Sequence, residues 1–246
     1  MLSLPTLPTT LQANLHALHE RITKAARASG RDPSSVRLLA VSKAFPATVI
    51  AEAARAGQRA FGENYVQEAL AKMDELVNSA ERPLEWHFIG PIQSNKTRAI
   101  AQAFDWVQSV DRLKIAERLA EQRPANLPLL NVLLQVNVSG EASKGGVAPD
   151  QLSQLAAAVA QLPRLRLRGL MTIPAPEIDV ARQRSAFALT NTLFRHLRTD
   201  GLKVDVLSMG MSDDLEAAIA EGVAQRLLSG AREDRAPSAP IRSRFS

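Results

Sequence analysis

The sequence predicts an α/β fold, a single (β/α)8 TIM barrel with one extra helix before its first strand. Short apolar runs alternate with amphipathic segments of about a dozen residues, a pattern typical of repeated βα units around a parallel sheet. The length of 246 residues and the 46% hydrophobic content suit one barrel domain, which commonly has about 250 residues. Eight expected strands with seven helices between them favour a closed barrel over an open doubly wound sheet.

The extra helix is expected at Leu11–Ala28, where apolar residues recur with helical spacing and Gly30 follows as a terminator. Short apolar runs predict strands at Val36–Ser42, Arg59–Phe61, Trp86–Gly90, Trp106–Val110, Leu129–Val138, Leu165–Thr172, Val204–Met209 and Val223–Leu228. Amphipathic segments predict the intervening helices at Pro46–Ala56, Val66–Val77, Asn95–Ala103, Leu113–Gln122, Pro149–Gln161, Val180–Leu197 and Asp213–Glu221.

The eighth strand is the doubtful element of this barrel, because Val223–Leu228 carries only a weak strand pattern. The stretch after Gly230 is rich in Pro, Ser and Arg and has no periodicity, which is typical of disorder. We therefore expect one barrel domain over residues 1–230 and a disordered tail over residues 231–246.

Helix caps are expected from short polar residues at the strand-to-helix turns. Ser94 is interpreted as the N-cap of the helix after the third strand. Asp213, Asp214 and Glu216 are interpreted as capping residues that complement the dipole of the last helix, rather than as ligands.

Composition excludes several kinds of chemistry. The chain has no cysteine, so thiolate catalysis, disulfides and cysteine-based zinc sites are ruled out. The net charge of +5 arises from 30 basic and 25 acidic residues that are mostly interspersed, and only one tyrosine and two tryptophans are available for base stacking. No apolar run approaches the roughly 20 residues of a membrane span. We expect a cytoplasmic protein with no nucleic-acid partner and no membrane partner.

Lys43 stands out because it follows the apolar run Leu38–Ser42, where a buried strand should end. In a parallel barrel the active groups gather at the carboxyl ends of the strands. An amine that is partly desolvated there favours its neutral, nucleophilic form and can make a Schiff base with an aldehyde such as pyridoxal phosphate. Taken alone, Lys43 also fits a strand-end lysine whose ammonium simply reaches water.

Two other strand ends carry groups that suit a ligand. Asn64 follows the second strand and offers both a hydrogen-bond donor and an acceptor. After the seventh strand, the hydroxyl of Ser208 and the flexible backbone at Gly210 suit a phosphate group.

Several long motifs resemble the pyridoxal phosphate homeostasis proteins, also called the proline synthase co-transcribed family. The similar stretches follow one another in the same order, over about residues 10 to 222: Ala40–Lys43, Phe61–Glu68, Glu85–Lys96, Gly169–Pro174 and Leu207–Asp214. This resemblance implies a barrel similar to the N-terminal domain of alanine racemase. It also implies pyridoxal phosphate as the cofactor, a Schiff base on Lys43, Asn64 beside the cofactor and Ser208 at its phosphate.

The C-terminal region departs from the family pattern. In the family, a last strand supplies an arginine facing the pyridine nitrogen and residues that hold phosphate. In this chain, Arg226 and Ser229 are approximate substitutes, without a residue-by-residue match. The expected cofactor-binding residues are Lys43, Asn64, Ser208, Gly210, Arg226 and Ser229.

The resemblance implies a carrier that stores, buffers or delivers pyridoxal phosphate, with little or no turnover. Racemisation needs a base on each face of the substrate carbanion, and the only tyrosine, Tyr65, belongs to the loop after the second strand. The alternatives are an amino-acid racemase that uses the same cofactor, and a barrel that has lost its cofactor through the altered last strand. We expect a monomer that makes transient contacts with pyridoxal phosphate-dependent enzymes.

The spacing of the histidines does not indicate a metal site. His16 and His19 lie three residues apart on the first helix, where exposure to solvent is the simpler interpretation. His87 alternates with Trp86 and Phe88, which indicates a hydrogen-bonded structural histidine rather than a ligand.

Overall fold

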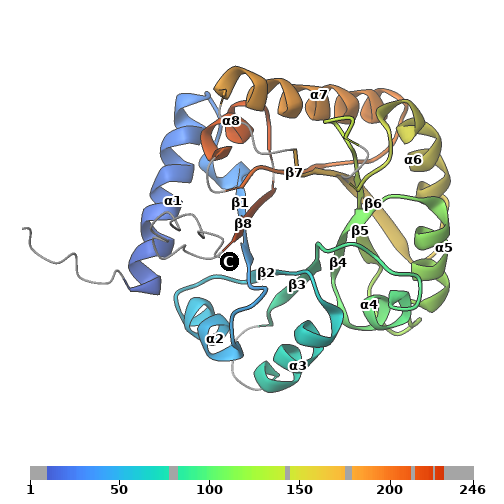
Figure 1. Cartoon of the computed structure of the whole chain (residues 1–246), viewed down its shortest axis with the longest axis horizontal. Coiled ribbons are helices and arrows are strands. Elements are labelled where there is room, and N and C mark those ends of the chain that lie inside the picture. The colour runs from blue at the N-terminus through green and yellow to red at the C-terminus, as the bar shows by residue number, and fades with distance from the viewer. Residues whose placement is uncertain are drawn as a thin grey trace, which may run out of the picture.

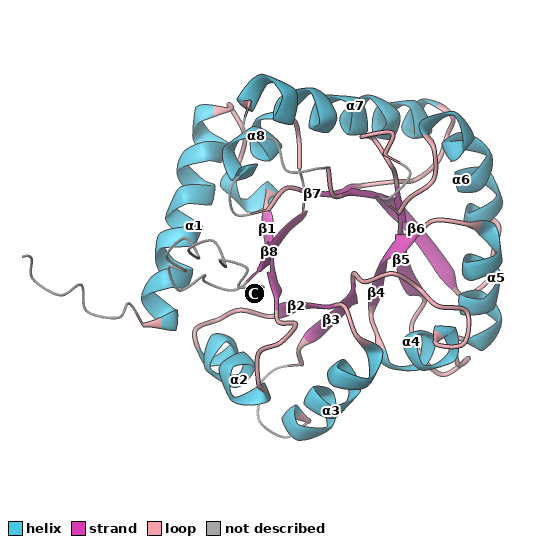
Figure 2. Ribbon diagram, viewed as in Figure 1, coloured by secondary structure: helices cyan, strands magenta, loops and turns pink. Residues whose placement is uncertain are grey.

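The structure is a computed structural model of the chain, and it describes residues 10–77, 83–141, 145–174, 179–211, 214–223 and 225–229. Eight parallel strands form a closed barrel in chain order, and helices surround it on the outside (Figures 1 and 2). The strands are β1 (Arg37–Val41), β2 (Ala60–Glu63), β3 (Glu85–Phe88), β4 (Trp106–Val110), β5 (Leu130–Gln135), β6 (Leu165–Thr172), β7 (Val206–Met209) and β8 (Gln225–Ser229). The (β/α)8 fold expected from the sequence is confirmed.

The helices of this outer layer follow the expected order. They are α1 (Leu11–Ala28), α2 (Ala47–Arg55), α3 (Val66–Leu76), α4 (Thr97–Ala103), α5 (Leu113–Gln122), α6 (Leu152–Ala160), α7 (Val180–Thr199) and α8 (Leu215–Ala220), with 3-10 turns η1 (Pro33–Ser35) and η2 (Pro149–Gln151). In the described part of the chain, none of these helices is long and apolar enough to cross a membrane.

The extra helix α1 lies beside α8 on the outside of the barrel (Figure 1). Arg21 of α1 pairs with Glu216 of α8 at 3.0 Å. Just after α1, the Arg31 guanidinium donates to the carbonyls of Ile219 and Val223 at 2.9 and 2.7 Å. These contacts hold the segment that leads into β8.

The eighth strand is present, so the doubt about it is corrected. It runs over Gln225–Ser229 rather than the expected Val223–Leu228, and it pairs with β1 at five positions, from Arg37 opposite Gln225 to Val41 opposite Ser229. Its pairing with β7 is limited to Ser208 opposite Gln225. The backbone of β8 completes the barrel although its sequence pattern is weak, because pairing depends on the backbone of its neighbours. The expected tail, residues 231–246, lies outside the described residues.

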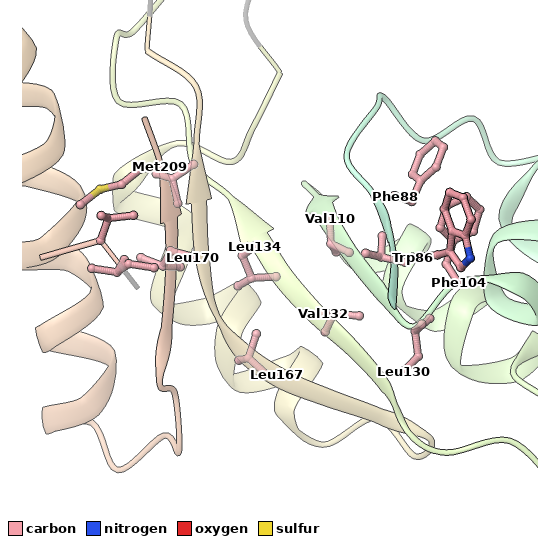
Figure 3. Packing of buried hydrophobic residues seen from close by; sticks show 14 of the residues in the cluster. Trp86, Phe88, Phe104, Val110, Leu130, Val132, Leu134, Leu167, Leu170 and Met209 are labelled. Atoms are coloured by element: carbon pink, nitrogen blue, oxygen red, sulfur yellow. The ribbon is translucent and has the colours of Figure 1, made fainter. Parts of the chain in front are cut away.

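Buried hydrophobic residues occupy both faces of the sheet, as expected for strands covered on each side. Alternate residues of β5, namely Leu130, Val132 and Leu134, pack in the layer between sheet and helices (Figure 3). Leu133 of the same strand belongs to a second cluster inside the barrel, with Leu39, Val41, Ala60, Ile89, Trp106 and Met171. This alternation means that residues two apart on a strand share a face.

One of the expected caps is wrong, and a second occupies the cap position without a side-chain cap hydrogen bond. The N-cap position of α4 is Lys96, whereas the Ser94 carbonyl accepts from the Thr97 hydroxyl at 3.0 Å. Asp214 stands at the N-cap of α8 but makes no side-chain cap hydrogen bond, and its Oδ1 accepts from the backbone N–H of Met211. Glu216 does lie in the first turn, while Asp213 lies outside the described residues. The local sequence did not reveal these competing partners.

Candidate functional site

Lys43 and Asn64 leave neighbouring strands at the same end of the barrel. Val41 and Gly62 are partners in the β1–β2 register, and Lys43 and Asn64 each come two residues later. Because side chains alternate along strands, the two positions continue the inward-facing rows of Val41 and Gly62. Asn64 is partly buried, whereas Lys43 is exposed to solvent, so the partial desolvation expected of its amine is wrong. The amine and the amide are thus on adjacent strand ends at the open mouth, as the sequence predicted.

The Asn64 side chain carries an unsatisfied acceptor. Its Oδ1 is buried and has no hydrogen-bond partner among the described residues. A buried polar oxygen without a partner is costly, about 1 to 3 kcal/mol. Gly90 permits the close approach of the Asn64 backbone, because a Cβ built on Gly90 would lie 2.2 Å from the backbone carbonyl oxygen of Asn64. A ligand with a hydrogen-bond donor at the barrel mouth would satisfy the Asn64 oxygen, so these residues fit a polar cofactor.

Ser208 lies inside the barrel at the end of a buried polar chain. Its hydroxyl donates to Gln108 Oε1 at 2.7 Å, and Gln108 Nε2 donates to His87 Nδ1 at 2.8 Å. His87 Nε2 then donates to Glu85 Oε1 at 2.7 Å. Because a phosphate only accepts hydrogen bonds here, the Ser208 hydroxyl has to rotate away from Gln108 before it can bind one. The phosphate role of Ser208 stays a prediction.

His87 is a structural histidine, as its alternation with apolar residues predicted. It is fully buried and stacks on Trp106, with 5.3 Å between ring centroids. Burial lowers the pKa of His87, and the bond to Glu85 opposes this only in part. Burial alone would raise the pKa of Glu85, but the bonds from His87 and Arg37 outweigh it and the pKa is lowered. A neutral His87 accepting from Gln108 and donating to Glu85 fits both shifts.

The loop after β7 has a backbone conformation at Gly210 that favours glycine. Gly210 has a φ of +88°, a left-handed conformation that other residues rarely adopt. The next amide, that of Met211, already donates to Asp214. The role of Gly210 at the cofactor phosphate stays a prediction.

The register separates the two expected residues of β8. Ser229 is the last residue of β8 and lies opposite Val41, at the end of the barrel that carries Lys43. Arg226 is the second residue of the strand and lies opposite Leu38, farther from that end. The backbone position therefore favours Ser229 over Arg226 as a neighbour of the cofactor, and both assignments stay predictions.

Histidines of the first helix are exposed, as expected. His16 pairs with Glu20 across one helical turn at 3.4 Å, and His19 Nδ1 lies 2.8 Å from the carbonyl of Leu15. No group of three or more His, Asp or Glu side chains that could hold a metal occurs within the described ranges.

Sequence reasoning missed the side chains that surround this site. Gln108 of β4 links Ser208 to His87, and Lys72 of α3 contacts Glu63, Glu68 and the Ser42 carbonyl. A signal was available for only one of these pairs, because Glu68 and Lys72 are four residues apart on a helix and of opposite charge.

The fold and the site define a class of protein, a closed parallel barrel with an exposed lysine amine at its mouth. The chain matches the family model described as "Alanine racemase, N-terminal domain" over residues 13–226. It is also 60% identical over 233 residues to the "Pyridoxal phosphate homeostasis protein" of Pseudomonas aeruginosa, covering 93% of this chain and 99% of that protein. The protein of the same name from Escherichia coli K12 is 55% identical over 209 residues, covering 85% and 89%.

This chain belongs to the pyridoxal phosphate homeostasis protein family, within the alanine racemase N-terminal domain group. PipY of Synechococcus elongatus PCC7942 is 36% identical, and the likeness covers 89% of this chain and 98% of PipY. The TM-score is 0.80 to PipY without PLP and 0.79 to PipY with PLP bound. The family resemblance noted in the sequence is confirmed.

Alanine racemase from Corynebacterium glutamicum shares the barrel fold, with a TM-score of 0.60 at 18% identity. The likeness covers 87% of this chain but 59% of the racemase. At this identity the comparison concerns the fold alone.

Proposed function

We propose that this chain binds pyridoxal 5'-phosphate as a Schiff base on Lys43 and stores, buffers or delivers it with little or no turnover. The observation that carries the proposal is the exposed Lys43 beside the unpaired buried oxygen of Asn64. Support comes from relatives named for pyridoxal phosphate homeostasis and from the PipY structure with PLP bound.

The attachment is a condensation between an amine and an aldehyde. Lys43 Nζ forms a C=N bond with the aldehyde carbon, and the aldehyde oxygen leaves as water. In this proposal Asn64 accepts a hydrogen bond from the cofactor, and Ser208, Gly210 and Ser229 hold its phosphate. Arg226 is the least favoured member of the set because its register partner is Leu38.

Little turnover is proposed because acid–base chemistry on two faces needs two bases at the site. Tyr65 is 64% exposed on the rim at the start of α3, and His87 is buried within a hydrogen-bonded chain. The alternative function, an amino-acid racemase, would use the same Lys43 as one base.

The test is spectroscopic. Purified protein with added pyridoxal phosphate is expected to show the absorbance band of a protein-bound Schiff base, and borohydride should fix the cofactor on the peptide that contains Lys43. Lys43→Ala should lose the band, while Lys24→Ala, an exposed lysine of α1, should keep it. A label on another lysine, or a band that survives in Lys43→Ala, would contradict the proposal.

Exchange of the α-proton of an amino acid with solvent distinguishes a racemase from a carrier of pyridoxal phosphate. Little exchange of the α-proton of added amino acids with deuterated solvent is expected. Exchange at enzymatic rates that disappears in Lys43→Ala would favour the racemase.

We also propose that the protein works as a monomer in the cytoplasm and passes pyridoxal phosphate to dependent enzymes through transient contacts. Sedimentation of the loaded protein should give one species of the monomer mass. A stable complex with an acceptor enzyme would argue against transient contact.

A further inference from the structure

Both peptide groups that border Lys43 are held by charged side chains of another element. The carbonyl of Ser42 belongs to the peptide before Lys43 and accepts from Lys72 Nζ at 2.8 Å. The amide of Ala44 belongs to the peptide after Lys43 and donates to Glu68 Oε1 at 2.7 Å. Lys72 and Glu68 both lie on α3, four residues apart. Tethering the two peptides restricts the backbone rotation that sets the direction of the Lys43 side chain.

The backbone next to Lys43 adopts a conformation that needs such support. Ala44 has a φ of +65°, and the left-handed region costs a residue with a Cβ roughly 1 to 2 kcal/mol. A turn bond from the Phe45 amide to the Ser42 carbonyl, at 3.1 Å, closes the same segment. The hydrogen bond from the Ala44 amide to Glu68 therefore stabilises a left-handed conformation that alanine would otherwise avoid.

The side chains that form these bonds are themselves fixed. Lys72 Nζ lies 2.8 Å from Glu63 Oε1 and 2.5 Å from Glu68 Oε1. Glu63 is fully buried and its Oε1 also accepts from the Ser42 hydroxyl at 2.6 Å. The bond from Lys72 and the amide of Ala44 help to hold the pKa of Glu68 below its ordinary value, so Glu68 is ionised at neutral pH. Charge-assisted bonds of this kind are shorter and stronger than neutral ones.

We propose that Glu68 and Lys72 are positioning residues that aim the Lys43 amine at the aldehyde of its cofactor. This inference rests on the proposed function, since it assigns the geometry of the same attachment. Neither side chain needs to touch the cofactor, because each acts through the backbone on one side of Lys43. A displacement of about 1 Å at a reacting group is enough to lower a rate by about a hundredfold.

The test compares three variants with the wild type at a temperature where circular dichroism shows all four to be folded. The rate of Schiff-base formation with added pyridoxal phosphate is measured by absorbance, and the protection of the Ala44 amide by hydrogen exchange. Glu68→Ala should lower the rate about tenfold to a hundredfold and remove the protection of Ala44. Glu68→Gln should recover most of both, because its amide oxygen accepts the same bond without the charge. Glu75→Ala, which removes an exposed carboxylate from the same helix, should match the wild type.

The outcomes separate this inference from the proposed function. A wild-type rate in Glu68→Ala overturns the positioning role alone, whatever happens to the protection of Ala44. Failure of Glu68→Gln to recover the rate overturns the hydrogen-bond explanation in favour of charge. Failure of the wild type itself to form a Schiff base overturns the proposed function, and the positioning role with it.

Discussion

The two sides of the barrel mouth are built in different ways. On the β1–β2 side, the turn that carries Lys43 is held by three charged side chains, Glu63, Glu68 and Lys72, with bonds of 2.5 to 2.8 Å. On the β7–β8 side, the two strands share one register pair, Ser208 opposite Gln225. The charged network thus restrains the backbone around the Lys43 amine. The residues proposed to bind the cofactor phosphate, in contrast, lie where the strands share few pairs. Mutation of β8 should therefore weaken binding of the cofactor phosphate more than it slows Schiff-base formation on Lys43.

The largest expected effect comes from breaking the charged network at its centre. Lys72→Met would leave the fully buried Glu63 without its cation. Removing one partner of a buried pair typically costs about 3 to 5 kcal/mol, so the free energy of unfolding should fall by that order in urea titrations. Lys24→Met, on the exposed face of α1, should change it by less than about 0.5 kcal/mol. Equal stability of the two variants would contradict the structural role of the network.

A smaller effect is expected on the opposite side, at the segment that leads into β8. Arg31→Ala removes the bonds to the carbonyls of Ile219 and Val223. Bonds from a charged donor contribute about 1.5 to 3 kcal/mol each when buried, but Arg31 is partly solvated, so a total loss of about 1 to 2 kcal/mol is expected. Hydrogen exchange should accelerate in β8 more than in β2. Uniform acceleration across the barrel would show that Arg31 does not act locally.

The smallest expected effect concerns the buried polar chain that runs from Ser208 of β7 through Gln108 of β4 to His87 of β3. Because burial lowers the folded-state pKa of His87, the unfolded chain binds a proton more readily than the folded one. The stability that this histidine contributes is therefore full above its unfolded pKa of about 6.5 and is lost as the pH falls below it. The free energy of unfolding should therefore fall as the pH is lowered from 6.5 to 5.5 in urea titrations.

His87→Gln should remove this part of the pH dependence, while His196→Gln, an exposed histidine beside Asp200, should keep it. The groups that face His87 also titrate: Glu85 has a lowered pKa, and Asp105 has a pKa raised by burial. Because both carboxyls are present in both variants, the difference between His87→Gln and His196→Gln reports on His87. An unchanged profile in His87→Gln would contradict the assignment.

Local periodicity predicted most of the fold. Trp106–Val110, Leu165–Thr172 and Leu113–Gln122 match the observed elements at both ends. The strand-end rule for parallel barrels likewise predicted the placement of Lys43 and Asn64 on adjacent strand ends. These are properties of the chain that depend on near neighbours or on the topology alone.

The remainder depends on partners distant in the sequence. The weak pattern of Val223–Leu228 gave no sign that the backbone would find five partners on β1. The bond between Ser208 and Gln108 joins residues one hundred positions apart, and no spacing rule indicates it. Tertiary contacts decided each of these positions.

Closure of the barrel by β1 and β8 has a consequence for how the protein is made. Synthesis runs from the N-terminus, so β1 is produced early while its partner β8 is among the last described segments to appear. Until then the nascent chain carries an open strand edge, which is a template for pairing with other chains. Native closure joins segments that lie far apart in the sequence and is therefore expected to be slow. Production of this protein should accordingly benefit from chaperones or from slower expression.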